Sequence, residues 1–155
     1  MADAKNEYTE IAKQIYDRHA DTVYSVCFMY MKNSQDAEDA VSNTFLKLLE
    51  KKKNFDSEEH EKAWLIRVAI NICKNTITHW SRDSVDISEI PLESKQVDNE
   101  VLRQVLELPD ELKVPVYLHY YAGYNSKEIG KLLGIADSSV RSRIRKAKKI
   151  LEKVL

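Results

Sequence analysis

The chain has 155 residues, of which 43% are hydrophobic and 32% are charged, and its formal net charge at pH 7 is −1. This length fits one ordinary domain or two small ones, and this composition excludes a wholly disordered chain. Only 3 Gly and 3 Pro argue against a turn-rich β-sandwich or barrel and favour long helices. No apolar run approaches the roughly 18–20 residues that span a bilayer, so we expect no membrane insertion.

The N-terminus and the two cysteines indicate a cytoplasmic protein. Residues 1–10 are polar and mixed in charge, without the apolar core of a signal peptide. Cys27 and Cys73 lie in apolar stretches without CxxC spacing. This is typical of reduced thiols in a hydrophobic core and not of a disulfide framework or a metal site. We therefore predict no bound metal and no cofactor.

Three amphipathic helices are predicted in residues 1–80. The first spans residues 8–31, where apolar side chains recur mostly three or four positions apart. Ser34 is expected to cap the second helix, whose first turn carries Asp36 at the positive end of the helix dipole. The third is expected to begin near Ala63, after a polar loop from Lys51 to Glu61. The side chains expected to be buried are Tyr8, Ile11, Ile15, Val23, Val26, Cys27, Tyr30, Ala37, Val41, Phe45, Leu48, Leu49, Trp64, Leu65, Val68, Ile72 and Ile77.

Helical periodicity disappears between residues 81 and 97. This segment combines acidic residues with serines and Pro91, a composition typical of a flexible linker. We therefore predict an all-α fold with two small helical domains, residues 1–80 and residues 98–155, joined by this linker. The second domain is expected to open with a helix at 99–106, and Pro109 fits the first turn of the helix that follows.

The pattern of residues 125–155 predicts a helix-turn-helix. Asn125 and Glu128 can form a capping box on a short helix, and Gly134 fits a C-cap position that needs a positive φ. Gly130 permits close approach by a neighbouring helix and is expected to cost about 0.5–1 kcal/mol of helix stability relative to alanine. A longer helix follows, whose outer face can enter a major groove. Its inner face carries apolar residues at i, i+4, i+7 and i+11, namely Val140, Ile144, Ala147 and Leu151.

The last helix concentrates positive charge. Residues 137–155 carry seven Lys and Arg against Asp137 and Glu152, although the net charge of the whole chain is −1. Arg can pair bidentately with guanine or phosphate, and Lys neutralises phosphate. The charge and the helix-turn-helix together favour duplex DNA as the ligand. For Arg145 and Lys149, an ion pair with Glu152 or simple exposure to solvent is an equally good interpretation.

Two blocks of the sequence resemble bacterial RNA polymerase sigma factors of the extracytoplasmic-function (ECF) group. Residues 108–112 (LPDEL), 128–135 (EIGKLLGI) and 140–147 (VRSRIRKA) are similar to region 4 of that family. Residues 36–39 (DAED) and 64–71 (WLIRVAIN) are similar to its region 2. The resemblance implies a three-helix region 2, a helix-turn-helix region 4, and a role in promoter-specific transcription initiation.

The resemblance also implies three sets of functional residues. The last helix would read the minus-thirty-five element as duplex DNA, through Ser138, Ser139, Arg141, Ser142, Arg143, Arg145 and Lys146. The melted minus-ten element would be held by a base-capturing loop with Lys53, Asn54 and Phe55, and by one helix face with Arg67, Asn71 and Lys74. Core RNA polymerase would meet Asp36, Asp39 and Asn43. For Phe55, hydrophobic anchoring of the loop is an equally good interpretation, and the two acids can also serve the helix dipole alone.

The implied partners are core RNA polymerase, through its clamp and flap, promoter DNA, and an anti-sigma protein that can hold the chain at the membrane. No small-molecule substrate is implied. An enzyme is disfavoured because the sequence has no phosphate-binding glycine loop, GxSxG or HExxH motif, and its four histidines are scattered singly. A helix-turn-helix regulator that binds duplex DNA without polymerase is the alternative function, and a helical module that binds only protein is a third.

Overall fold

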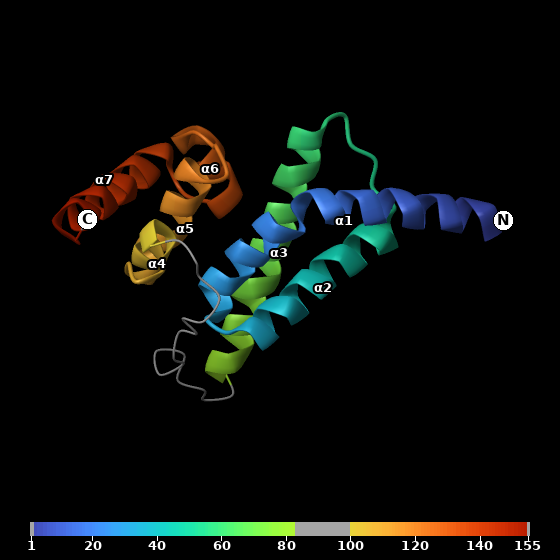
Figure 1. The fold of residues 1–155 in the computed structure, drawn as a ribbon, viewed down its shortest axis with the longest axis horizontal. Coiled ribbons are helices and arrows are strands. Elements are labelled where there is room, and N and C mark those ends of the chain that lie inside the picture. The colour runs from blue at the N-terminus through green and yellow to red at the C-terminus, as the bar shows by residue number, and fades with distance from the viewer. Residues whose placement is uncertain (1, 83–99, 155) are drawn as a thin grey trace. The chain divides into compact units, whose positions relative to one another are not determined.

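The computed structural model describes residues 2–82 and 100–154, and within these ranges it contains seven α-helices and no β-strand. The chain divides into two compact units, residues 1–91 and residues 92–155. The prediction of an all-α fold with two helical domains is therefore confirmed (Figure 1). Most of the predicted linker lies outside the described residues. Its first two residues, Ser81 and Arg82, still belong to the third helix.

The first unit is a three-helix bundle of α1 (Ala2–Met31), α2 (Ser34–Lys51) and α3 (Glu58–Arg82). Each helix packs against the other two, and Figure 1 shows α3 crossing the α1–α2 pair. Cys27 and Cys73 are both free and fully buried, as predicted. A hydrogen bond with Cys27, together with burial, raises the pKa of the Cys73 thiol. The Cys73 thiol therefore keeps its proton within the core.

Two helix starts in this unit differ from the prediction. Asn33, not Ser34, caps α2, because its side-chain oxygen accepts a hydrogen bond from the Asp36 amide at 2.9 Å. The helix α3 begins at Glu58 and not near Ala63. Its first turn is stabilised by the Ser57 hydroxyl, which accepts a bond from the His60 amide at 3.1 Å, and by acidic residues at the positive end of the dipole. Only residues 52–57 remain as the loop.

The buried faces of the bundle are partly shifted from the predicted ones. Ile11 is 45% exposed while Ala12 is buried, and Leu49 is 38% exposed. In α3, of the predicted residues only Leu65 is fully buried; Trp64, Val68, Ile72 and Ile77 are half-buried. The others that fill the core are Ile66, Ala69, Ile70 and Cys73. Since α3 packs against both α1 and α2, its buried face is wider than a single apolar stripe and is rotated from it.

The second unit contains α4 (Glu100–Leu106), α5 (Asp110–Tyr120), α6 (Ser126–Leu133) and α7 (Asp137–Val154). Pro109 stands at the N-cap of α5, one position before the predicted first turn. The predicted capping box of α6 is confirmed: Asn125 Oδ1 accepts from the Glu128 amide at 2.9 Å, and the Asn125 amide donates to Glu128 Oε1 at 3.0 Å. Gly134 ends this helix with a φ of 71°, also as predicted. The helix-turn-helix is thus defined by local sequence signals.

Gly130 lies where the turn between α6 and α7 passes over α6. A Cβ atom added to it would lie 2.7 Å from the carbonyl oxygen of Ile135. The Ile135 amide in turn donates to the Gly130 carbonyl oxygen at 3.0 Å. The predicted approach of a neighbouring helix is confirmed in part, because the Asp137 amide of α7 would lie 3.5 Å from that Cβ, but the nearest group is the backbone of the turn. The propensity gain expected of alanine does not apply here, since a Cβ cannot fit unless the turn moves.

Gly130→Ala is expected to lower the free energy of unfolding of the second unit by about 1–3 kcal/mol, because overpacking against the backbone outweighs a propensity gain of about 1 kcal/mol. Urea denaturation followed by circular dichroism measures this change. Ser142→Ala, on the exposed side of α7, is the matched control and should alter stability by no more than about 0.5 kcal/mol. A more stable Gly130→Ala variant would contradict the tight turn.

Candidate nucleic-acid interface

The helix α7 presents one apolar face to its unit and one polar face to solvent. Val140 and Ala147 are fully buried and Ile144 and Leu151 are half-buried, which confirms the predicted inner face. A helix turns about 100° per residue, so the side opposite to this face carries Ser138, Ser142 and Arg145. All three are exposed. Their side chains are free to enter the groove of a duplex.

The other predicted duplex-contacting residues lie beside this outer face. Lys146 is exposed next to it, and Ser139 and Arg143 are half-buried. Arg141 and Arg143 are two positions apart, which places them about 200° apart around the helix and on opposite flanks. Flanking cations suit the two phosphate backbones that border a groove, while the outer face suits base edges. Within the described part of the chain, Arg145 and Lys149 form no ion pair with Glu152, so simple exposure describes both in this structure.

Asp137 organises the start of α7. Its Oδ2 atom lies 2.8 Å from Nη1 of Arg141, one turn further along the helix. A hydrogen bond with the Ser126 hydroxyl and the nearby Arg141 guanidinium lower the pKa of the Asp137 carboxyl. Ser126 belongs to α6, so Asp137 connects both helices of the motif and orients Arg141. The contact with Ser126 could not be predicted, because a partner on α6 is not visible from helical spacing.

In the first unit, the predicted minus-ten residues lie on α3 and on the loop before it. Arg67, Asn71 and Lys74 are all exposed. Their spacing of four and three places them on one face of α3. In the loop of residues 52–57, Asn54 is exposed while Lys53 and Phe55 are half-buried. The three α3 residues therefore share one exposed face, whereas only Asn54 of the three predicted loop residues is exposed.

The Phe55 ring packs against the first two turns of α3. Its centroid lies 5.3 Å from that of His60, nearly edge-on, and 5.7 Å from that of Trp64. These distances and angles are typical of stabilising aromatic pairs. The geometry favours the interpretation of Phe55 as a hydrophobic anchor of the loop. Asn54 is then the loop amide that is most available to a ligand.

The predicted polymerase-contacting residues of α2 are in two different environments. Asp39 and Asn43 are exposed, whereas the Asp36 carboxylate accepts a hydrogen bond of 2.7 Å from Asn33 Nδ2 and so completes the helix cap. Leu46 lies on the same face as Asp39 and Asn43 and is 59% exposed. Leu46 was not among the predicted site residues, although a leucine that falls outside the predicted apolar stripe was an available signal.

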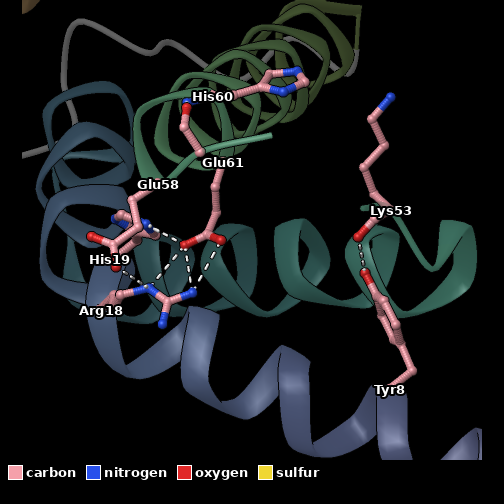
Figure 2. A network of polar contacts seen from close by, with 8 residues as sticks. Tyr8, Arg18, His19, Lys53, Glu58, His60 and Glu61 are labelled. Carbon is pink, nitrogen blue, oxygen red and sulfur yellow. Dashed lines mark hydrogen bonds and ion pairs between the residues drawn. The ribbon is translucent and has the colours of Figure 1, made fainter. Parts of the chain in front are cut away.

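A partly buried ionic cluster connects α1 to the first turn of α3 (Figure 2). Glu61 is only 6% exposed, and its two carboxylate oxygens accept hydrogen bonds of 3.0 Å from Nε and Nη2 of Arg18. Nε2 of His19 lies 2.7 Å from Glu61 Oε1. Glu58 is more distant, at 3.8 Å from Arg18 Nε, and is largely exposed. The sequence analysis missed this cluster because its members are far apart in the chain and Glu61 was assigned to a polar loop.

None of the described residues form a group of three or more His, Cys, Asp or Glu side chains that could hold a metal ion. None of the helices in residues 2–82 and 100–154 is both long and apolar enough to cross a bilayer.

Comparison with known families assigns both units. Residues 15–82 match the family model of sigma-70 region 2, and residues 98–151 match that of sigma-70 region 4. The chain belongs to the sigma-70 family. Among its relatives, the ECF RNA polymerase sigma factor SigW of Bacillus subtilis is 25% identical, over 91% of this chain and 87% of SigW. The ECF sigma factor SigM of Mycobacterium tuberculosis is 24% identical, over 92% of this chain and 76% of SigM.

Two solved structures share the fold of this sigma-70 family member. The sigma factor RpoE in complex with the anti-sigma factor NepR, from Bartonella quintana, has a TM-score of 0.72 at 19% identity, over 91% of this chain and 94% of RpoE. CnrH in complex with the cytosolic domain of CnrY has a TM-score of 0.65 at 18% identity, over 99% of this chain and 92% of the matched chain. The predicted resemblance to ECF sigma factors is thus confirmed by sequence relatives and by fold.

Proposed function

We propose that this chain binds core RNA polymerase and directs it to initiate transcription at particular promoters, without polymerase chemistry of its own. The observation that carries the proposal is the outer surface of α7, which concentrates exposed cations on a chain of net charge −1. In this function Ser138, Ser142 and Arg145 contact base edges of the duplex minus-thirty-five element. Arg141 and Arg143, on the flanks, contact its phosphates.

The first unit would hold the melted minus-ten element. The face of α3 with Arg67, Asn71 and Lys74 can follow the backbone of the non-template strand, because single strands are bound by cationic and amide groups along a groove or face. The loop of residues 52–57 would receive a base extruded from the stack. Asn54 offers the exposed amide for that base, while Phe55 and Lys53 hold the loop.

The polymerase would contact both units. The exposed face of α2, with Asp39, Asn43 and Leu46, combines an acidic group with an apolar one and suits a basic clamp helix. The second unit has a mainly apolar groove of about 650 Å³ that suits a helix of the flap. It is lined by Val105, Val116, Tyr120, Tyr121, Lys148, Leu151 and Glu152. We also propose an anti-sigma protein as a regulatory partner, since RpoE, which shares the fold, was solved with the anti-sigma factor NepR. We propose the cytoplasm as the site of action, since CnrH, which also shares the fold, was solved with the cytosolic domain of CnrY.

Run-off transcription with purified core polymerase on genomic fragments tests the proposal. We expect transcripts with defined start sites only when both the chain and core polymerase are present. Strong retardation of the same promoter fragments by the isolated chain at physiological salt would favour the autonomous helix-turn-helix regulator. Initiation by core polymerase at the same sites without the chain would refute the proposal.

Asp39→Lys is expected to weaken association with core polymerase about 10-fold, mainly through a slower association rate, because it reverses the charge that faces a basic partner. Surface plasmon resonance with immobilised core polymerase at two salt concentrations measures this effect. Glu38→Lys is the matched control, since Glu38 is also exposed on α2 but points about 100° away. Equal weakening by the two substitutions would argue against this face as the contact.

A further inference from the structure

The loop of residues 52–57 is attached to α1 near its start. The hydroxyl group of Tyr8 donates a hydrogen bond of 2.8 Å to the carbonyl oxygen of Lys53, 45 residues away in sequence (Figure 2). Tyr8 is buried, with 8% of its surface exposed. Burial raises the pKa of its hydroxyl group, so the group retains its proton and remains a donor. The backbone just before Asn54 is therefore fixed by a side chain from another helix.

The first turn of α3, directly after the loop, is also attached to α1. Glu61, in the first turn of α3, receives both guanidinium hydrogen bonds from Arg18 and a third contact from His19. Figure 2 shows Tyr8 reaching toward Lys53 and Arg18 toward Glu61. The paired Arg–carboxylate geometry fixes orientation as well as distance. Residues 53 and 61 are thus both positioned by α1.

The Tyr8 hydrogen bond does more for the path of the loop than for the stability of the bundle. A single neutral hydrogen bond contributes only about 1 kcal/mol to folding, and the bundle has a large apolar core without it. Lys52 has a φ of 47° in the left-handed region that lysine rarely adopts, so the chain turns sharply just before the attached carbonyl. The loop is therefore held at Lys53 and at Phe55, and the helix turn that follows it is held through Glu61, while Asn54 stays exposed.

We propose that Tyr8, Arg18 and Glu61 form a brace that orders the loop in advance for an extruded minus-ten base. They are positioning residues, because they lie behind the loop and act through its backbone. This inference rests on the proposed function of the loop. Binding by a loop that is already ordered does not have to supply the ordering free energy, so the brace raises the affinity for an unpaired base without touching it.

Tyr8→Phe tests the brace because it removes only one hydroxyl group, and Tyr16→Phe is its matched control. Tyr16 is on the same helix, but it is exposed and contacts Phe45 through its ring. The chain bound to core polymerase is titrated with a fluorescent single-stranded DNA that carries the non-template minus-ten sequence mapped by run-off transcription. Tyr8→Phe is expected to bind this DNA about 5-fold more weakly, the equivalent of one neutral hydrogen bond. Tyr16→Phe should bind as the wild type does.

An abasic series separates ordering of the loop from general damage. Removing one base at a time should reveal, in the wild type, the position whose base is captured. On the strand that lacks this base, the wild type and Tyr8→Phe should bind with equal affinity, because the loop then has no base to bind and contributes nothing to the affinity. Arg18→Lys, which keeps the charge but loses the paired geometry, should behave likewise.

The outcomes are distinct. Equal binding by Tyr8→Phe and Tyr16→Phe would overturn the brace, and so would a defect that persists unchanged on the abasic strand, since that would indicate a merely structural role. A wild-type complex with no dependence on any base would overturn the proposed function of the loop and the brace with it.

Discussion

Reversing the charge of Arg141, Arg143 and Lys146 together, each to glutamate, is expected to abolish promoter-directed transcription by this chain. The three side chains lie on the outer surface of α7 or on its flanks, so their replacement places anions against phosphates and base edges. Each lost contact costs about 1–3 kcal/mol, and binding to a minus-thirty-five duplex should fall by at least about 100-fold. The slope of log affinity against log salt should decrease in magnitude by about 3, since each phosphate contact contributes about one unit.

The measurement is a duplex titration with the chain at saturating core polymerase, over a range of salt concentrations. The matched control reverses the charge of three exposed lysines of the first unit, namely Lys13, Lys47 and Lys51. This control changes the net charge of the chain by the same amount. That control should retain nearly full affinity for the duplex. If the α7 variant still directs transcription, the chain is a protein-binding module and α7 is only a solvated helix face.

The helix-turn-helix could be predicted from the sequence because its signals are local. The Asn125–Glu128 capping box and the φ of Gly134 each depend on residues within one or two turns. The inner face of α7 follows from apolar spacing along a single helix. Gly130 marks the limit of this reasoning: its role depends on the carbonyl of Ile135, and only the path of the turn reveals that contact.

The first unit was predicted less well because its details depend on long-range contacts. Helical periodicity gives one stripe per helix, yet α3 packs against two helices and buries Ile66 and Ile70 in addition to Leu65. The charged start of α3 has no apolar period, so its capping by Ser57 was overlooked. The candidate residues Asp39 and Asn43 on α2, and the three on α3, do lie on exposed faces, since spacing of three and four is enough to define a face.

Glu61→Ala is expected to destabilise the first unit by about 2–4 kcal/mol. The substitution removes the carboxylate that is hydrogen-bonded to Arg18 and His19. The buried His19 ring and one edge of the Arg18 guanidinium then lose this partner. An unpaired buried charge or donor costs several kcal/mol. The value should fall below the upper end of that range, because the Arg18 side chain is 38% exposed and can recover part of its hydration.

Urea unfolding followed by tryptophan fluorescence reports on this unit alone, since both tryptophans of the chain, Trp64 and Trp80, lie in α3. Glu58→Ala is the matched control: Glu58 is one turn away, is 71% exposed and lies 3.8 Å from Arg18. An exposed ion pair of that kind contributes little, so its loss should change stability by no more than about 0.5 kcal/mol. Equal unfolding midpoints for the two variants would show that Glu61 is not a structural link between α1 and α3. A large difference would show that the start of α3, and with it the end of the loop, depends on a contact with α1.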